Sequence, residues 1–195
     1  MSLGEVATGG RSGPVVGVVL VSRGDEGAVP DDSDDIPQLE RLRALLAGFG
    51  AGGCGDLYVA LGSRVVQAPR DSSTAFYVPE WYDALDETVG AALTFAAGID
   101  GVAGVLVQTI DSQDLGDVGV ARVLDAAAGR PEVLVRASCH GHLAQPVYVG
   151  AGLLTDVSRV IADSGGAVRY LREHAGEVVT VDCSDLAGPV VDVLG

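Results

Sequence analysis

Short apolar runs recur along the chain, each followed by a polar or glycine-rich stretch. Such runs predict strands that are covered on both faces, because strands of this kind are almost continuously apolar. The predicted strands are residues 15–21, 56–61, 74–78, 104–110, 133–137, 146–149 and 178–183. The run at 104–110 is the most continuous of the later ones, and we expect it in the interior of the sheet.

Between these runs, apolar residues return at intervals of three and four, which is the spacing of one helical face. The first such face extends from Leu39 to Phe49, with Pro37 placed where a first helical turn tolerates proline. Further helices are predicted at residues 85–96, 118–128, 153–162 and 167–174. Alternating strands and helices predict an α/β fold, with a mostly parallel central sheet between two helical layers (three-layer α/β/α).

Length and the absence of an internal repeat or linker favour one domain, residues 14–195. The opening Met-Ser-Leu-Gly is typical of an expression-tag remnant, and residues 1–13 are expected to form a flexible leader. The apolar runs are too short to cross a bilayer, and no signal-peptide pattern precedes them. Three widely spaced cysteines fit reduced thiols, so a cytoplasmic protein is expected.

Charge narrows the range of partners. The chain has 27 acidic and 12 basic residues, for a net charge of −15, and every basic residue is arginine. An acidic surface repels a phosphodiester backbone and an anionic membrane, so nucleic acid and membranes are not expected partners. A small molecule or another protein is favoured instead.

Candidate chemistry lies at the carboxyl ends of the predicted strands, where open parallel sheets bind their ligands. The first strand leads into Ser22-Arg23-Gly24, and the 104–110 strand leads into Asp111. An aspartate in this position can hold a Mg²⁺ ion that bridges nucleotide phosphates. It can also cap the next helix or turn, and the spacing alone favours the cap.

A family resemblance favours the metal hypothesis. Its residues are Val15 to Leu20, Pro37 to Arg41, Ala60 to Gly62, Pro79 to Trp81, Gly90 to Leu93, Val105 to Asp111, Gly141-His142, Pro146-Val147, Gly166-Ala167 and Tyr170-Leu171. In their order and spacing, these stretches resemble the MobA-like NTP transferases of molybdenum-cofactor synthesis. The resemblance implies a nucleotide-diphospho-sugar-transferase-like fold and Mg²⁺-dependent transfer of a nucleotide from CTP or GTP to molybdopterin. It also implies phosphate contacts from Ser22, Arg23 and Gly24, and metal ligands at Asp111 and Asp192.

The first loop departs from the family. Active members carry Leu-Ala-Ala-Gly-x-x-x-Arg-x-Gly-x-x-Lys, whereas here Asp25 and Glu26 follow Gly24 and the chain has no lysine. A charge about 4 Å from a phosphate changes its energy by roughly 4 kcal/mol at an effective dielectric near 20. The loop therefore predicts lost or altered transferase activity, or a non-catalytic relative that binds a ligand or regulates a partner. A related fold with other chemistry on an unphosphorylated molecule is a third hypothesis.

Three other patterns are interpreted conservatively. Cys139-His140-Gly141-His142 is interpreted as a loop rather than a metal site, because no second ligand pair lies nearby in the sequence. The acidic stretch from Arg23 to Asp35 lacks the EF-hand spacing and is expected to be a solvated, mobile loop. Trp81 and Tyr82 are interpreted as partly buried core residues rather than base-stacking residues.

Overall fold

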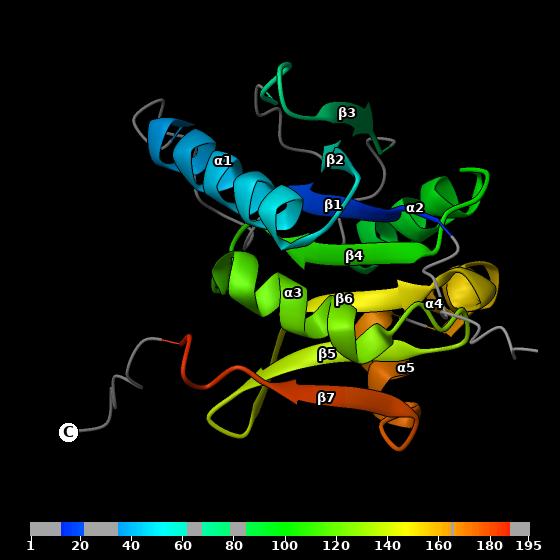
Figure 1. Cartoon of the computed structure of the whole chain (residues 1–195). Coiled ribbons are helices and arrows are strands. Elements are labelled where there is room, and N and C mark those ends of the chain that lie inside the picture. The colour runs from blue at the N-terminus through cyan, green and yellow to red at the C-terminus, as the bar shows by residue number, and fades with distance from the viewer. Residues whose placement is uncertain (1–12, 22–34, 62–67, 79–84, 165, 188–195) are drawn as a thin grey trace, which may run out of the picture.

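One seven-stranded sheet forms the centre of the molecule (Figure 1). The computed structural model describes residues 13–21, 35–61, 68–78, 85–164 and 166–187. Its strands are β1 (Val15–Val21), β2 (Asp56–Leu61), β3 (Thr74–Tyr77), β4 (Gly104–Thr109), β5 (Leu134–Cys139), β6 (His142–Gly150) and β7 (Val178–Asp182). Their order across the sheet is β3-β2-β1-β4-β6-β5-β7.

Only β6 runs against the other strands of this sheet. It pairs antiparallel with both β4 and β5, whereas every other pairing is parallel. The predicted mostly parallel sheet is thus confirmed. The strand predicted at 104–110 is β4, and it lies in the interior between β1 and β6.

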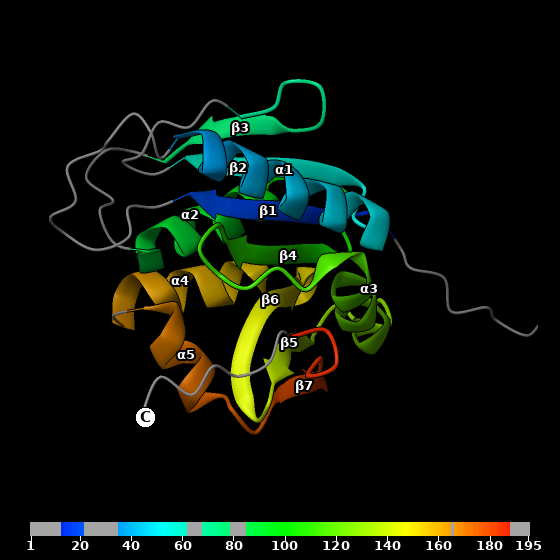
Figure 2. The same ribbon diagram turned by 90° about the vertical axis from the view of Figure 1, so that its left-hand side faces the viewer.

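Helices cover both faces of the sheet (Figures 1 and 2). One layer contains α1 (Asp35–Gly52) and α3 (Gly116–Ala127), and the other contains α2 (Leu85–Ala97), α4 (Leu154–Ser164) and α5 (Ala167–Glu173). A short 3-10 turn, η2 (Ala151–Leu153), leads from β6 into α4. The predicted three-layer architecture is confirmed. None of the described helices is both long and apolar enough to cross a membrane.

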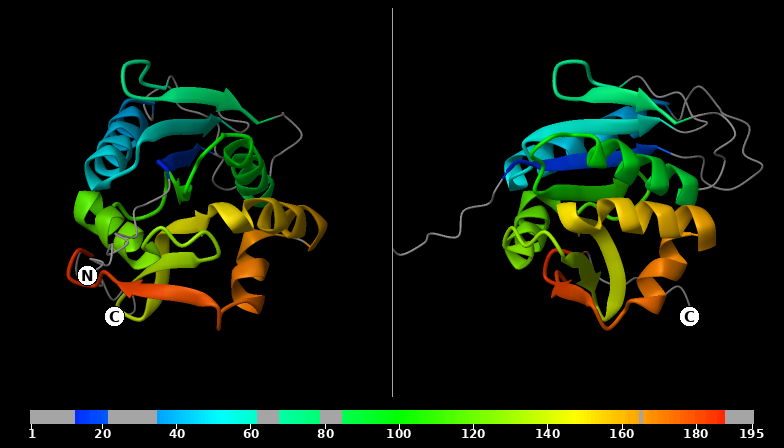
Figure 3. Two further views of the ribbon diagram at one scale, coloured as in Figure 1. Left: turned by 45° about the vertical axis from the view of Figure 1, so that its right-hand side comes forward. Right: turned by 90° about the vertical axis from the view of Figure 1, so that its right-hand side faces the viewer.

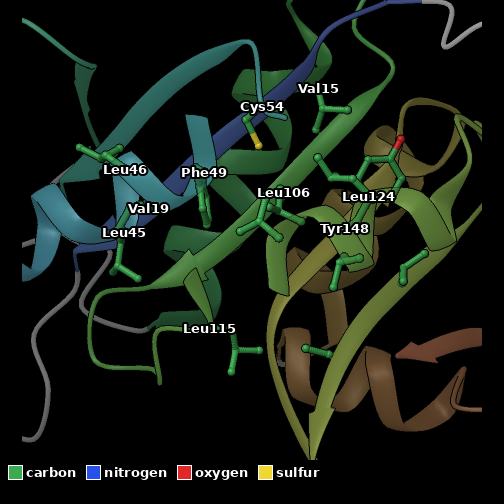
Figure 4. Close-up of a cluster of buried hydrophobic side chains, with 14 of the residues drawn as sticks. Val15, Val19, Leu45, Leu46, Phe49, Cys54, Leu106, Leu115, Leu124 and Tyr148 are labelled. Carbon is green, nitrogen blue, oxygen red and sulfur yellow. The ribbon is translucent and has the colours of Figure 1, made fainter. Parts of the chain in front are cut away.

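The core consists of two apolar layers, one on each face of the sheet. Alternate residues of β1 enter different layers: Val19 packs with Leu106 and Phe49 beneath α1 and α3 (Figure 4), whereas Val18 packs under α2. This two-sided burial explains why the strand is apolar at every position. Gly17 leaves room for Phe49, because a Cβ at this position would lie 2.6 Å from the Phe49 ring.

The segment from Cys139 to His142 is a tight hairpin turn rather than an irregular loop. Cys139 and His142 pair as the last residues of β5 and the first of β6. Between them, His140 and Gly141 have φ angles of 51° and 79°, the left-handed conformation that two-residue hairpin turns require. The predicted four-residue strand at 146–149 is therefore the second half of a nine-residue strand, β6.

Candidate functional site

The carboxyl ends of β1 and β4 lie side by side and form the candidate site. Leu20 is in register with Thr109, and the amide of Ile110 donates a hydrogen bond to the Leu20 carbonyl at 2.9 Å. Asp111 follows at once, so it lies at the edge of the sheet where β1 ends. The predicted phosphate-binding residues Ser22, Arg23 and Gly24, and the second metal ligand Asp192, are outside the described residues, as are Trp81 and Tyr82.

The carboxylate of Asp111 is exposed at this edge. It makes no hydrogen bond or ion pair with any residue in the described part of the chain. Asp111 does not cap α3. The N-cap residue is Leu115, which makes no side-chain cap hydrogen bond, and the amide of Gly116, the first residue of α3, donates to Asp114 Oδ1 at 2.8 Å. The Asp111 carboxylate is thus available to a ligand.

Arg41 fixes the backbone of the turn that carries Asp111. From α1, its Nη2 donates to the carbonyl oxygens of Asp111 at 3.1 Å and Ser112 at 2.6 Å. Ser112 Oγ in turn donates to the carbonyl of Thr109 at 2.8 Å. The sequence interpretation gave Arg41 no role. The sequence could have indicated this position, because the first turns of the helix that follows β1 must lie near the carboxyl end of β1.

A metal ion at this edge would depend on few protein ligands. No group of three or more histidine, cysteine or acidic side chains in the described ranges could hold a metal ion. A lone carboxylate suits Mg²⁺ or Mn²⁺ when phosphate oxygens and water complete the coordination. Asp111 could therefore hold a cation that arrives with a nucleotide, rather than a permanent structural ion.

A cavity of about 430 Å³ lies beside this edge, between the sheet and the layer of α2, α4 and α5. Figure 3 shows α4 and α5 next to β6 and β5 in both of its views. Leu20 and Thr109, from the ends of β1 and β4, belong to its lining, so the cavity reaches the edge that carries Asp111. Most of the wall is aliphatic: Leu20, Val89, Leu93, Val107, Leu134, Leu143, Val147, Val149, Val157, Ile161, Ala167, Leu171 and Ala175.

An irregularity in β6 shapes the polar end of the cavity. Arg136 pairs with Val147 and Ser138 pairs with Leu143, so three residues of β6 face one residue of β5. This bulge brings Gln145 across to β4, where its Oε1 accepts a hydrogen bond from the amide of Thr109 at 2.6 Å. Bulges commonly redirect side chains next to binding sites. Sequence reasoning missed this site, and the only signal was a Gln-Pro pair inside an apolar strand.

The fold is similar to that of solved nucleotidyltransferases, with a nucleotide-diphospho-sugar-transferase-like architecture. No family model and no curated protein matches the sequence itself.

Three solved structures illustrate the likeness. Rv0371c of Mycobacterium tuberculosis, crystallised with manganese, aligns with a TM-score of 0.60 at 17% identity, over 87% of this chain and 88% of its own. A nucleotidyl transferase from Methanothermobacter gives 0.58 at 12% identity, over 87% and 88%. The 2-C-methyl-D-erythritol 4-phosphate cytidylyltransferase of Thermus thermophilus gives 0.56 at 15% identity, over 90% and 92%. At these identities the likeness defines the fold and leaves substrate and activity open.

Proposed function

We propose that the chain is a nucleotidyltransferase of altered activity that binds a nucleoside triphosphate, CTP or GTP, through a divalent cation at Asp111. The observation that carries the proposal is the exposed Asp111 carboxylate. It lies at the carboxyl end of β4, beside the end of β1, on a turn whose carbonyls accept hydrogen bonds from Arg41. Ligands of open α/β sheets bind at such ends. A nucleotidyl transferase and a manganese complex among the similar structures support it.

In this proposal, the protein contributes position and the cation contributes charge. A bound Mg²⁺ or Mn²⁺ would neutralise phosphate oxygens, which is the main requirement of phosphoryl and nucleotidyl transfer. Asp111 would hold the cation, and Arg41 would keep the Asp111 turn in place through its two carbonyl hydrogen bonds. Phosphate contacts from Ser22, Arg23 and Gly24, and a second ligand at Asp192, remain predictions of the family resemblance.

We expect the altered activity to concern the acceptor substrate of the transfer. Molybdopterin, which the resemblance implies, carries a phosphate group and would need cationic contacts. The cavity next to Asp111 is mostly aliphatic, and its charged side chains are Arg136 and Arg172. An acceptor with a large apolar surface fits this lining better, because apolar contact is what such a wall offers.

A non-catalytic, ligand-binding relative is the second candidate function. The total absence of lysine favours it, together with the acids that follow Gly24, because triphosphate binding without the family's lysine loses a large electrostatic contribution. The two candidates differ in one measurable product. A transferase releases pyrophosphate from the nucleotide when its acceptor is present, whereas the non-catalytic relative binds without release.

Thermal unfolding with CTP or GTP, with and without Mg²⁺ or Mn²⁺, tests the metal site. A ligand at a hundred times its Kd adds about 2.7 kcal/mol, which raises the Tm of a chain of this size by roughly 5–10 °C. We expect that rise only with metal present, and we expect Asp111→Asn to abolish it. Asp100→Asn is the matched control, since Asp100 is an exposed acid at the opposite end of β4. An equal response of both variants would refute the metal site.

A further inference from the structure

The charge of the cavity lining is opposite to that of the whole chain. The chain carries 27 acidic and 12 basic residues, yet the ionised lining side chains, Arg136 and Arg172, are both cationic. No acidic residue lines the cavity among the residues that the structure describes. A neutral ligand does not explain why arginines line the cavity and acidic residues do not. An anionic ligand does, because positive charge in the wall lowers the cost of removing the anion from water.

Arg136 carries the argument furthest. Its guanidinium is partly buried in the wall formed by β5, and the Nε atom is buried with no hydrogen-bond partner. One Nη2 contact, to the carbonyl of Ala144, is long at 3.5 Å. Burial lowers the pKa of Arg136 from its ordinary value, since desolvation disfavours the charged form. Because Nε has no accessible surface, a ligand in the cavity would reach the guanidinium through its Nη groups, whose only hydrogen bond in the described part of the chain is the long one to Ala144.

Two further donors stand in the same lining. Gln145 uses its Oε1 to accept from Thr109, which leaves its Nε2 group without a hydrogen bond in the described part of the chain. Tyr170 also lines the cavity, and burial, with help from nearby Glu177 and Asp156, raises its pKa. The Tyr170 hydroxyl therefore stays protonated near neutral pH and can donate. The polar groups of the lining are thus mainly donors.

We propose that this cavity binds a small amphipathic carboxylate, with its apolar body against α4 and α5 and its carboxylate on Arg136 and Gln145. The cavity is the one that we propose for the acceptor, but the inference rests on its lining and does not require nucleotide binding at Asp111. Ligand pockets are typically about 300–1,000 Å³, so about 430 Å³ suits one small organic molecule. The Nη groups of a guanidinium can donate to the two oxygens of a carboxylate.

The wall favours a carboxylate over a phosphate ester. A phosphate carries close to two charges near neutral pH and exposes three acceptor oxygens, all of which must be compensated when they leave water. Here, one partly buried guanidinium and one exposed guanidinium face an aliphatic wall. A single negative charge balances Arg136 with less polar surface to desolvate. Octanoate, octyl phosphate and octanol therefore form a suitable set of probes.

Isothermal titration of the full chain with these three probes, without nucleotide or metal, tests the proposal. We expect octanoate to bind more tightly than octyl phosphate and octanol. Arg136→Met should weaken octanoate by at least about tenfold and leave octanol unchanged, because only the carboxylate loses a charge-assisted hydrogen bond. Arg43→Met removes the same charge from an exposed position on α1 and should change none of the three affinities.

A second variant keeps the test independent of Arg136. Ala175 is exposed at the cavity mouth, so Ala175→Trp should block the cavity without disturbing the core, and it should reduce the binding of all three probes. The inference is overturned if octanoate fails to bind, if octyl phosphate binds more tightly, or if Arg136→Met binds octanoate as the wild type does. Loss of nucleotide binding in the separate metal test would leave these results unaffected.

Discussion

Replacing Arg136 by methionine should stabilise the ligand-free protein. Arginine at this position places a charged group in an aliphatic wall, with Nε buried and unpartnered. Methionine keeps an unbranched apolar stem of similar reach and removes both the charge and the unsatisfied donor. The substitution therefore separates what Arg136 does for folding from what it does for a ligand.

The size of the effect follows from the contacts of the guanidinium. A buried polar group with no partner costs about 1–3 kcal/mol, and more when it is charged. The hydrogen bond that the substitution removes, from Nη2 to the Ala144 carbonyl, is 3.5 Å long and adds little. Because Arg136 is only partly buried, the lower end of the range applies. We expect a gain of about 1 kcal/mol, which raises Tm by roughly 2–4 °C for a chain of this length.

Calorimetric or fluorescence-monitored unfolding measures this gain. The comparison must be made against Arg43→Met, because both variants make an already acidic chain more negative by one charge. That shared change lowers stability through self-repulsion, and the control removes it from the difference. Adding octanoate should reverse the order of the two variants, since only the Arg43 variant keeps Arg136 for the carboxylate.

A lower Tm for Arg136→Met than for Arg43→Met, without ligand, would refute the reasoning. It would mean that the guanidinium stabilises the fold through an acceptor, so that its burial needs no ligand to explain it. Identical unfolding of both variants would also count against the reasoning, because the unsatisfied Nε would then cost nothing.

Two further predictions concern stability. Tyr148→Phe removes a buried hydroxyl that donates to the Ala103 carbonyl at 2.9 Å, and that carbonyl still accepts from the amide of Ala151 at 3.0 Å. We expect calorimetry to show a loss of about 1 kcal/mol in the free energy of unfolding, and an unchanged value would contradict the prediction. The hydrogen bonds from Arg122 hold the pKa of Asp185 below its usual value. The pair therefore stabilises the fold fully above pH about 4, and this contribution disappears as the pH falls through the lowered pKa. Asp185→Asn should flatten the acid side of a plot of Tm against pH, and an unchanged slope would exclude this role.

The sheet could be predicted from the sequence because burial on both faces leaves a strong pattern. The strand predicted at 15–21 has the bounds of β1, and the strand predicted at 56–61 has those of β2. The first half of β6 escaped prediction, since His142 and Leu143 are exposed and the alternation there is weak. The hairpin requires His140 to adopt the left-handed conformation. Histidine adopts it more often than most residues, but the sequence alone does not predict it at this position.

The candidate site was predictable only where topology determines it. A residue that follows an interior parallel strand must lie at its carboxyl end, so the position of Asp111 followed from the pattern alone. The contact between Arg41 and the Asp111 turn depends on how α1 packs against the next loop. Arg136 was hidden for a different reason. It interrupts an apolar strand, and its surroundings depend on the bulge in β6, where Nη2 contacts the Ala144 carbonyl.

The distribution of charge separates the two sites. At the carboxyl edge, Nη2 of Arg41 already donates to two backbone carbonyls, and we propose that a metal ion on Asp111 would supply further positive charge for phosphate. In the cavity, by contrast, Arg136 remains although burial makes its charge costly and folding supplies no partner for Nε. Places where a protein keeps a locally unfavourable group are commonly its functional sites. By that criterion, the unfavourable burial of Arg136 is stronger evidence for a ligand in the cavity than the hydrogen-bonded Arg41 is for a ligand at the carboxyl edge. The carboxylate test is therefore the more informative of the two.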